Sequence, residues 1–191
     1  MKDKYNSFKE LSNHECEGKD FRVVLKNRNS GTTILAPHGG KIESHTSKIA
    51  EIIAGQEFNL YCFEGCKKTL NYETLHITSH KFDEPRCITL LSHSRNVFTV
   101  HGCDGTKNEI YIGGRNKILR RSITKKLQDV GLTVYECDHK FLGEEERNIC
   151  NRGITGAGIQ FELTKHFRSN SKMKNKFIET IRNILLSKQS E

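Results

Sequence analysis

Short apolar runs that alternate with helical segments constrain this chain more than any other feature. Runs rich in Val, Ile, Phe and Tyr predict strands at residues 21–25, 32–36, 58–63, 75–78, 97–101, 109–112, 132–137 and 159–163. Apolar residues at helical spacing predict helices at 43–54, 84–91, 115–130 and, closing the chain, 172–186. The alternation predicts an α/β fold, with an open mixed β-sheet of seven or eight strands and helices on both faces.

The length of 191 residues suits one compact domain, and no linker, repeat or change in composition divides it. We therefore expect a single domain over residues 1–191, and a monomer. No apolar stretch approaches the roughly 18 residues of a membrane span, and residues 1–5 lack the apolar core of a signal peptide. We expect synthesis in the cytoplasm and no membrane partner.

The formal net charge of +8 predicts an attraction to polyanions, either a nucleic acid or an acidic polymer. The densest basic run, residues 115–126, contains no aromatic residue on which a base could stack. We interpret that run as a solvated helix face, which disfavours a nucleic-acid partner.

The seven cysteines form no CxxC pair, and only Cys62 and Cys66 are closely spaced. Structural zinc sites made of cysteine bring their ligands in close pairs. We therefore predict reduced thiols and disfavour a cysteine metal site.

Stronger metal-ligand candidates follow the predicted strand 32–36. His38 and Glu43 are five residues apart, so one helix face cannot hold both, but a turn at Gly39-Gly40 could bring them together. The sequence predicts Glu43 in the first turn of the next helix. A carboxylate there also suits the helix dipole, which leaves a purely structural role open.

A third ligand could come from several histidines. His101 ends the predicted strand 97–101, where a buried hydrogen-bonded histidine is also common. His80 is its strongest rival. The further rivals are His45, His76 and His93. Spacing alone leaves this choice open.

Glu162 is the candidate for proton transfer. Residues 159–164 alternate, so Gln160, Glu162 and Thr164 share one face of the predicted strand. In a central strand this carboxylate would need a cleft, whereas in an edge strand it would simply face solvent.

Arg152 lies in the turn-rich approach to that strand and could stabilise an oxyanion or bind a substrate carboxylate. A surface ion pair with one of the glutamates at 144–146 is an equally good interpretation. Further substrate-binding candidates are His80, Arg86, Arg115 and Asn151.

Four segments, in this order, resemble the phage-type poly-γ-glutamate hydrolase family, over about residues 20–168. They are His-Gly-Gly-Lys-Ile-Glu at 38–43, Leu-His-Ile-Thr-Ser-His-Lys-Phe-Asp-Glu-Pro at 75–85, Val-His-Gly at 100–102 and Gly-Ile-Gln-Phe-Glu-Leu at 158–163. The resemblance implies a zinc carboxypeptidase-like fold. It also implies one zinc ion held by His38, Glu43 and His101, with Glu162 as the catalytic proton-transfer residue, and it thus selects His101 over His80.

The sequence departs from the carboxypeptidases themselves in two respects. Their metal pair is HxxE, whereas four residues separate His38 from Glu43, and the pair Asn151-Arg152 follows the third ligand instead of preceding it. We therefore assign Asn151-Arg152 no terminal-carboxylate role.

The resemblance implies a zinc hydrolase that cleaves γ-glutamyl amide bonds of poly-γ-glutamate, a substrate that suits the positive charge. The sequence leaves open whether lysis of a host releases the protein. One rival hypothesis is an amidohydrolase acting on small acylated or γ-glutamyl amino acids. A second is a basic nucleic-acid-binding protein of a mobile element.

Overall fold

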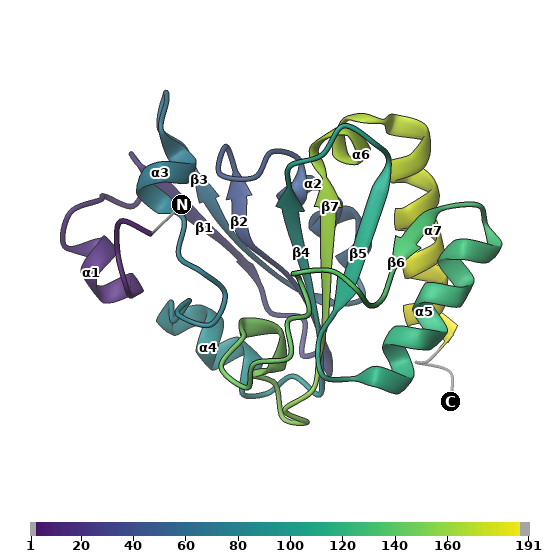
Figure 1. The fold of residues 1–191 in the computed structure, drawn as a ribbon. Helices are drawn as coiled ribbons and strands as arrows, with labels where there is room; N and C mark the ends of the chain where they lie inside the picture. Colours follow the sequence, from purple (N-terminus) through teal and green to yellow (C-terminus); the bar gives the residue numbers. More distant parts are fainter. Residues whose placement is uncertain (1–2, 188–191) are drawn as a thin grey trace.

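The computed structural model describes residues 3–187, which form one open mixed sheet (Figure 1). In these residues the sheet has seven strands, ordered β1-β3-β2-β4-β7-β5-β6. The strands are β1 (Phe21–Lys26), β2 (Thr32–Gly40), β3 (Asn59–Gly65), β4 (Asn96–Cys103), β5 (Glu109–Gly113), β6 (Thr133–Tyr135) and β7 (Ile159–Thr164). The inner strands β3, β2, β4 and β7 are parallel, while β1 is antiparallel to β3 and β5 is antiparallel to β7. The predicted fold class is confirmed.

Helices cover both faces of the sheet. The first face packs against α2 (Thr46–Ala54), α5 (Lys117–Asp129) and α7 (Ser171–Ser187). The second packs against α1 (Phe8–Ser12), α3 (Asn71–Leu75), α4 (Pro85–Leu91) and the 3-10 turn η1 (Ile149–Asn151), while α6 (Lys165–Ser169) follows β7. In the described part of the chain, 3–187, no helix is both long and apolar enough to cross a membrane.

Two apolar cores result, one on each face. Alternate residues of a strand enter opposite cores, as the period of two requires. Ile34 and Leu60 join the core under α2, whereas their neighbours Leu35 and Tyr61 join the core under α3 and α4. The central strands are therefore covered on both sides, and a polar side chain within them must be paired or face a hollow.

Two predicted elements differ from the structure. Residues 75–78 do not form a strand, because the backbone amide and hydroxyl of Thr78 donate to the Asp3 carboxylate instead of to a neighbouring strand. The helix predicted from residue 43 begins only at Thr46, because His45 has a left-handed backbone with φ of 75°. Glu43 therefore lies in a turn before the helix, and its predicted place in the first helical turn is wrong.

Candidate metal centre

The carboxyl end of β2 positions the first two candidate ligands. β2 continues to Gly40, beyond the predicted end at Ala36, and its register against β3 shifts between Ala36 and Gly39. Such a bulge turns a side chain out of the regular alternation of the strand. His38 lies within this irregular stretch and is 2% exposed.

Gly40 then allows the chain to reverse. Its φ is 62°, and a Cβ atom there would lie 2.6 Å from the carbonyl oxygen of Gly65, so a side chain does not fit. The turn closes with the amide of Glu43 donating to the carbonyl of His38 at 2.9 Å. As a result, Nδ1 of His38 lies 3.2 Å from Oε1 of Glu43.

The neighbouring strand β4 brings His101 to the same point. Nδ1 of His101 lies 3.1 Å from Nδ1 of His38 and 3.9 Å from Oε2 of Glu43. The amide of Gly102 donates to Oε2 of Glu43 at 2.7 Å, which fixes the carboxylate. The three residues proposed from the family resemblance thus meet in space, all buried.

His76 also reaches this cluster, from the segment after α3. Its ring lies against that of His38, tilted by 33° at a centroid distance of 4.1 Å, and its Nε2 lies 4.0 Å from Oε1 of Glu43. One ligand atom from each of His38, Glu43 and His76 lies within 4.8 Å of the others, so these three could hold a metal ion. The sequence identified His76 only as one rival among several.

The orientation of His76 depends on Asp3, a residue that no sequence pattern marks. Nδ1 of His76 lies 2.8 Å from Oδ1 of Asp3, across 73 positions of the chain. Asp3 in turn accepts two hydrogen bonds from Thr78. A carboxylate that accepts the proton of one ring nitrogen leaves the other nitrogen free to bind a metal. Only the fold reveals such a long-range pair.

The cluster fits a metal ion such as zinc. Bonds of about 2.0–2.2 Å in a tetrahedral site place ligand atoms roughly 3.3–3.5 Å apart, close to the His38–Glu43 and His38–His101 separations. Nε2 of His38 contacts the carbonyl oxygen of Ile77 at 2.8 Å, so Nδ1 of His38 can face an ion.

Burial and charge set the proton affinities of the cluster. Burial alone would lower the pKa of His38, but the charge and hydrogen bond of Glu43 outweigh it and raise that pKa. Burial would raise the pKa of Glu43, but His38 outweighs this and lowers it. Burial, followed by the charge of His38, lowers the pKa of His101 to about 3. The cluster therefore holds an ionised carboxylate beside a neutral His101 imidazole, as metal binding requires.

Glu162 lies beside this cluster on β7. Its strand is central, between β4 and β5, and all six of its residues are buried, which excludes the edge-strand alternative. Glu162 pairs in register with His101, so their side chains share one face of the sheet about 4.8 Å apart. Burial, and then the charge of Glu43, raises the pKa of Glu162 well above its ordinary value.

A hollow of about 410 Å³ opens on Glu162. We call it the Glu162 hollow. Its wall includes Ser79, His80, Lys140 and Phe141. It supplies the cleft that the sequence required for a polar residue in a central strand, and it brings the substrate-binding candidate His80 to that cleft.

A second hollow, of about 880 Å³, contains three further candidates, Arg115, Asn151 and Arg152. We call it the arginine hollow. Nη1 of Arg152 donates to the carbonyl of Phe82 at 3.2 Å, and no ion pair within residues 3–187 joins Arg152 to a glutamate at 144–146. Arg152 lines this second hollow and not the Glu162 hollow. The Asn151 amide is occupied by backbone groups of the surrounding loops.

The structure does not bring Arg86 to either hollow. Its guanidinium pairs with Glu84 at 2.7 Å and with Glu17 at 2.9 Å. Together with His93 it lines a separate hollow beside α4. The rival ligand His93 therefore lies apart from the metal cluster.

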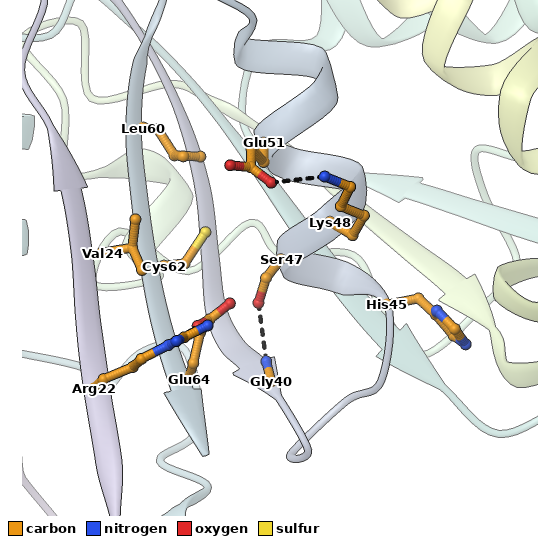
Figure 2. Close-up of a pocket in the computed structure, with 10 residues that line it drawn as sticks. All are labelled: Arg22, Val24, Gly40, His45, Ser47, Lys48, Glu51, Leu60, Cys62 and Glu64. Atoms are coloured by element: carbon orange, nitrogen blue, oxygen red, sulfur yellow. Dashed lines mark hydrogen bonds and ion pairs between the residues drawn. The ribbon is translucent and has the colours of Figure 1, made fainter. Parts of the chain in front are cut away.

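Another hollow, of about 340 Å³, lies on the opposite face between β1, β3 and α2 (Figure 2). Val24, Leu60 and Cys62 line its apolar part, and the rival ligand His45 lies at its margin. Burial raises the pKa of the Cys62 thiol, so this cysteine is not a ready metal ligand. The hollow contains no member of the metal cluster.

Known proteins share the sequence pattern and the fold of this chain. The family model described as "Poly-gamma-glutamate hydrolase" matches residues 5–183. Among curated proteins, the UPF0714 protein YndL of Bacillus subtilis (strain 168) is 36% identical over 170 residues, which are 88% of this chain and 66% of YndL. The SPbeta prophage-derived UPF0714 protein YoqZ of the same strain is 34% identical over 87% of this chain and 60% of YoqZ. The chain thus spans less than two thirds of the length of these two relatives.

Solved structures show the same likeness. A bacteriophage poly-gamma-glutamate hydrolase superposes with a TM-score of 0.92 and 25% identity, over 99% of each chain. A structure of YndL described as apo and zinc-free superposes with a TM-score of 0.89 and 33% identity, over 96% of this chain and 98% of that one. The α/β architecture with its mixed sheet is therefore shared with these two proteins.

Proposed function

This chain belongs to the poly-gamma-glutamate hydrolase family, and from that premise we propose that it is a zinc hydrolase that cleaves γ-glutamyl amide bonds of poly-γ-glutamate. One observation carries the proposal. A buried cluster of two imidazoles and a carboxylate with the spacing of metal ligands lies next to a second buried carboxylate, at a hollow. A catalytic zinc site needs this set, three ligands and a separate general base.

We assign the zinc ligands to Nδ1 of His38, the carboxylate of Glu43 and Nδ1 of His101. Nδ1 of His101 lies 3.1 Å from Nδ1 of His38, a separation that suits two ligands of one ion and supports this choice. The distances to Glu43, 3.9 Å from His101 and 4.0 Å from His76, are nearly equal. The side chain of His76 is 15% exposed, more than the other three. We expect His76 to face the substrate from the open side of the cluster.

When bound at these residues, zinc would polarise the amide carbonyl and lower the pKa of water at the site from near 15.7 toward about 7. Glu162 accepts the proton of the attacking water and returns it to the leaving nitrogen. Its raised pKa suits the first step, because a carboxylate with a higher proton affinity is a stronger base toward the attacking water. Nε2 of Gln160 donates to Oε1 of Glu162 at 3.4 Å and helps to orient that carboxylate.

Metal content and cleavage, measured together, test the proposal. We expect the purified protein to hold about one zinc per chain and to shorten poly-γ-glutamate. A chelator should abolish cleavage, and added zinc should restore it. A metal-free protein, or cleavage that is insensitive to complete chelation, would contradict the proposal.

The lengths of the products separate the proposed reaction from the small-substrate alternative. Cleavage within the polymer yields a ladder of shortening chains, visible by electrophoresis. If only acylated or γ-glutamyl amino acids react and the polymer stays intact, the result supports a zinc hydrolase but contradicts poly-γ-glutamate as its substrate.

A further inference from the structure

The Glu162 hollow and the arginine hollow are neighbours on the α4 face of the sheet. His80 lines both, and the segment that contains Glu144 to Arg152 forms part of the wall of each. The amide of Ile149 donates to the carbonyl of Ser79 at 3.0 Å, which holds this segment against the segment after α3. In Figure 1 the green segment before β7 lies beside α4, on that face of the sheet. A chain that leaves the Glu162 hollow past His80 therefore enters the arginine hollow.

The arginine hollow carries an excess of positive charge. Its lining includes the four cations Lys81, Arg115, Arg147 and Arg152 but only two acids, Asp83 and Glu146. Asp83 already accepts a hydrogen bond from the amide of Phe8.

Two of these cations are available to a ligand. Arg115 and Arg147 are exposed, and no ion pair among residues 3–187 involves either guanidinium. A guanidinium presents two parallel N–H groups that match the two oxygens of a carboxylate.

We propose that the arginine hollow is a carboxylate-binding subsite, in which Arg115 and Arg147 hold carboxylates of glutamyl units beyond the scissile bond. The inference rests on the proposed polymer substrate and adds where the units beyond the scissile bond would bind. Every unit of a γ-linked chain carries a free α-carboxylate, so units that extend past His80 bring anions to these arginines. The subsite therefore gives affinity to long chains that a dipeptide cannot obtain.

Binding to a chain that cannot be cut tests this subsite directly. In the Glu162→Gln background, calorimetry gives the Kd for poly-γ-glutamate and for a γ-glutamyl dipeptide. The double substitution Arg115→Glu and Arg147→Glu should weaken polymer binding about tenfold, because it replaces attraction by repulsion at two positions. Dipeptide binding should change less than about twofold.

A matched control removes the general effect of net charge. Lys125→Glu with Lys126→Glu makes the same change in charge on α5, which covers the opposite face of the sheet. Equal weakening by the control pair, or unchanged polymer binding in the arginine pair, would overturn the subsite. If the reversed pair does not fold, Arg115→Gln with Arg147→Gln should still weaken polymer binding about threefold.

The proposed reaction and the proposed subsite can fail separately. If the unaltered protein does not cut the polymer but the arginine pair weakens its binding, the subsite holds and the reaction falls. If the unaltered protein cuts the polymer and the arginine pair binds it as before, the reaction holds and the subsite falls.

Discussion

Burial decides what Glu162 can do. Burial, and then the charge of Glu43, make the ionised form of Glu162 costly, so this carboxylate binds a proton more strongly than one in solvent. The substitution Glu162→Gln keeps the shape and removes the proton exchange. We expect unchanged zinc content and a turnover of poly-γ-glutamate lower by a factor of about 10²–10⁴. Metal analysis and cleavage rates measure the two effects.

The exposed Glu179 on α7 gives a control of the same chemistry. Glu179→Gln should leave both zinc content and rate unchanged. Full activity in Glu162→Gln would remove the assigned role, and so would loss of the metal together with activity, because Glu162 would then be a ligand.

Either His101 or His76 could be the third zinc ligand, and single substitutions distinguish them. If His101 binds zinc, His101→Ala should lower the affinity for zinc by a factor of about 10² or more, since it removes one of three ligands. His76→Ala should retain zinc and affect mainly the reaction. Competition with a chromophoric chelator measures both affinities. The reverse order of the two variants would make His76 the ligand, with Asp3 as its supporting carboxylate.

The sequence predicts the chemical roles of these side chains, but it does not predict which other side chains contact them. His38 and His101 lie near the carboxyl ends of β2 and β4, and Glu43 follows β2. The carboxyl ends of parallel strands meet at one edge of a sheet. Asp3 and His76 are far apart in the chain and belong to no regular element of the sheet. No periodic pattern marks such a pair, because tertiary packing alone brings it together.

The end of β2 shows how one irregular element controls the site. The left-handed φ of Gly40 and the contact that a Cβ atom would make with Gly65 both exclude a side chain. Gly40→Ala should therefore destabilise the fold by about 1–3 kcal/mol and displace Glu43 from His38, which weakens zinc binding. Thermal unfolding without zinc and zinc titration separate the two effects.

Gly18 provides a control, since its φ is also positive, at 85°, but a Cβ atom there meets nothing within 4 Å. Gly18→Ala should cost only the backbone strain, about 1 kcal/mol, and leave zinc affinity unchanged. Equal zinc affinity in Gly40→Ala would show that the turn does not position Glu43.

Elements with a clear period were predicted well, and irregular ones were not. Residues 159–163 alternate regularly and form β7, because a strand covered on both faces buries alternate side chains on opposite sides of the sheet. The strand predicted at 75–78 and the helix start at 43 were wrong for different reasons. Long-range hydrogen bonds from Thr78 to Asp3 replace strand pairing in the first case, and the left-handed backbone of His45 delays the helix in the second.

The sheet, its two cores and the candidate cluster follow from the arrangement of the whole chain. The strands β2, β4 and β7 are parallel neighbours, and they bring residues from three separate parts of the sequence together at their carboxyl ends. The order of these strands could not be derived from their number, because several crossover patterns suit the same alternation. The family resemblance implied a mixed sheet and a set of ligands, but the order of the strands comes from the structure.

The net charge of +8 is a property of the whole molecule that should be visible in kinetics. Exposed charges separated by more than about 8–10 Å are screened at physiological salt. We therefore expect the KM for poly-γ-glutamate to rise several-fold as salt increases from low to high concentration, while kcat changes little, because the buried centre is screened less. The KM for a γ-glutamyl dipeptide, with fewer carboxylates, should rise less. A KM for the polymer that is independent of salt would show that hydrogen bonds within the Glu162 hollow, and not the field of the molecule, capture the substrate. Thermal unfolding at each salt concentration controls for effects on the fold.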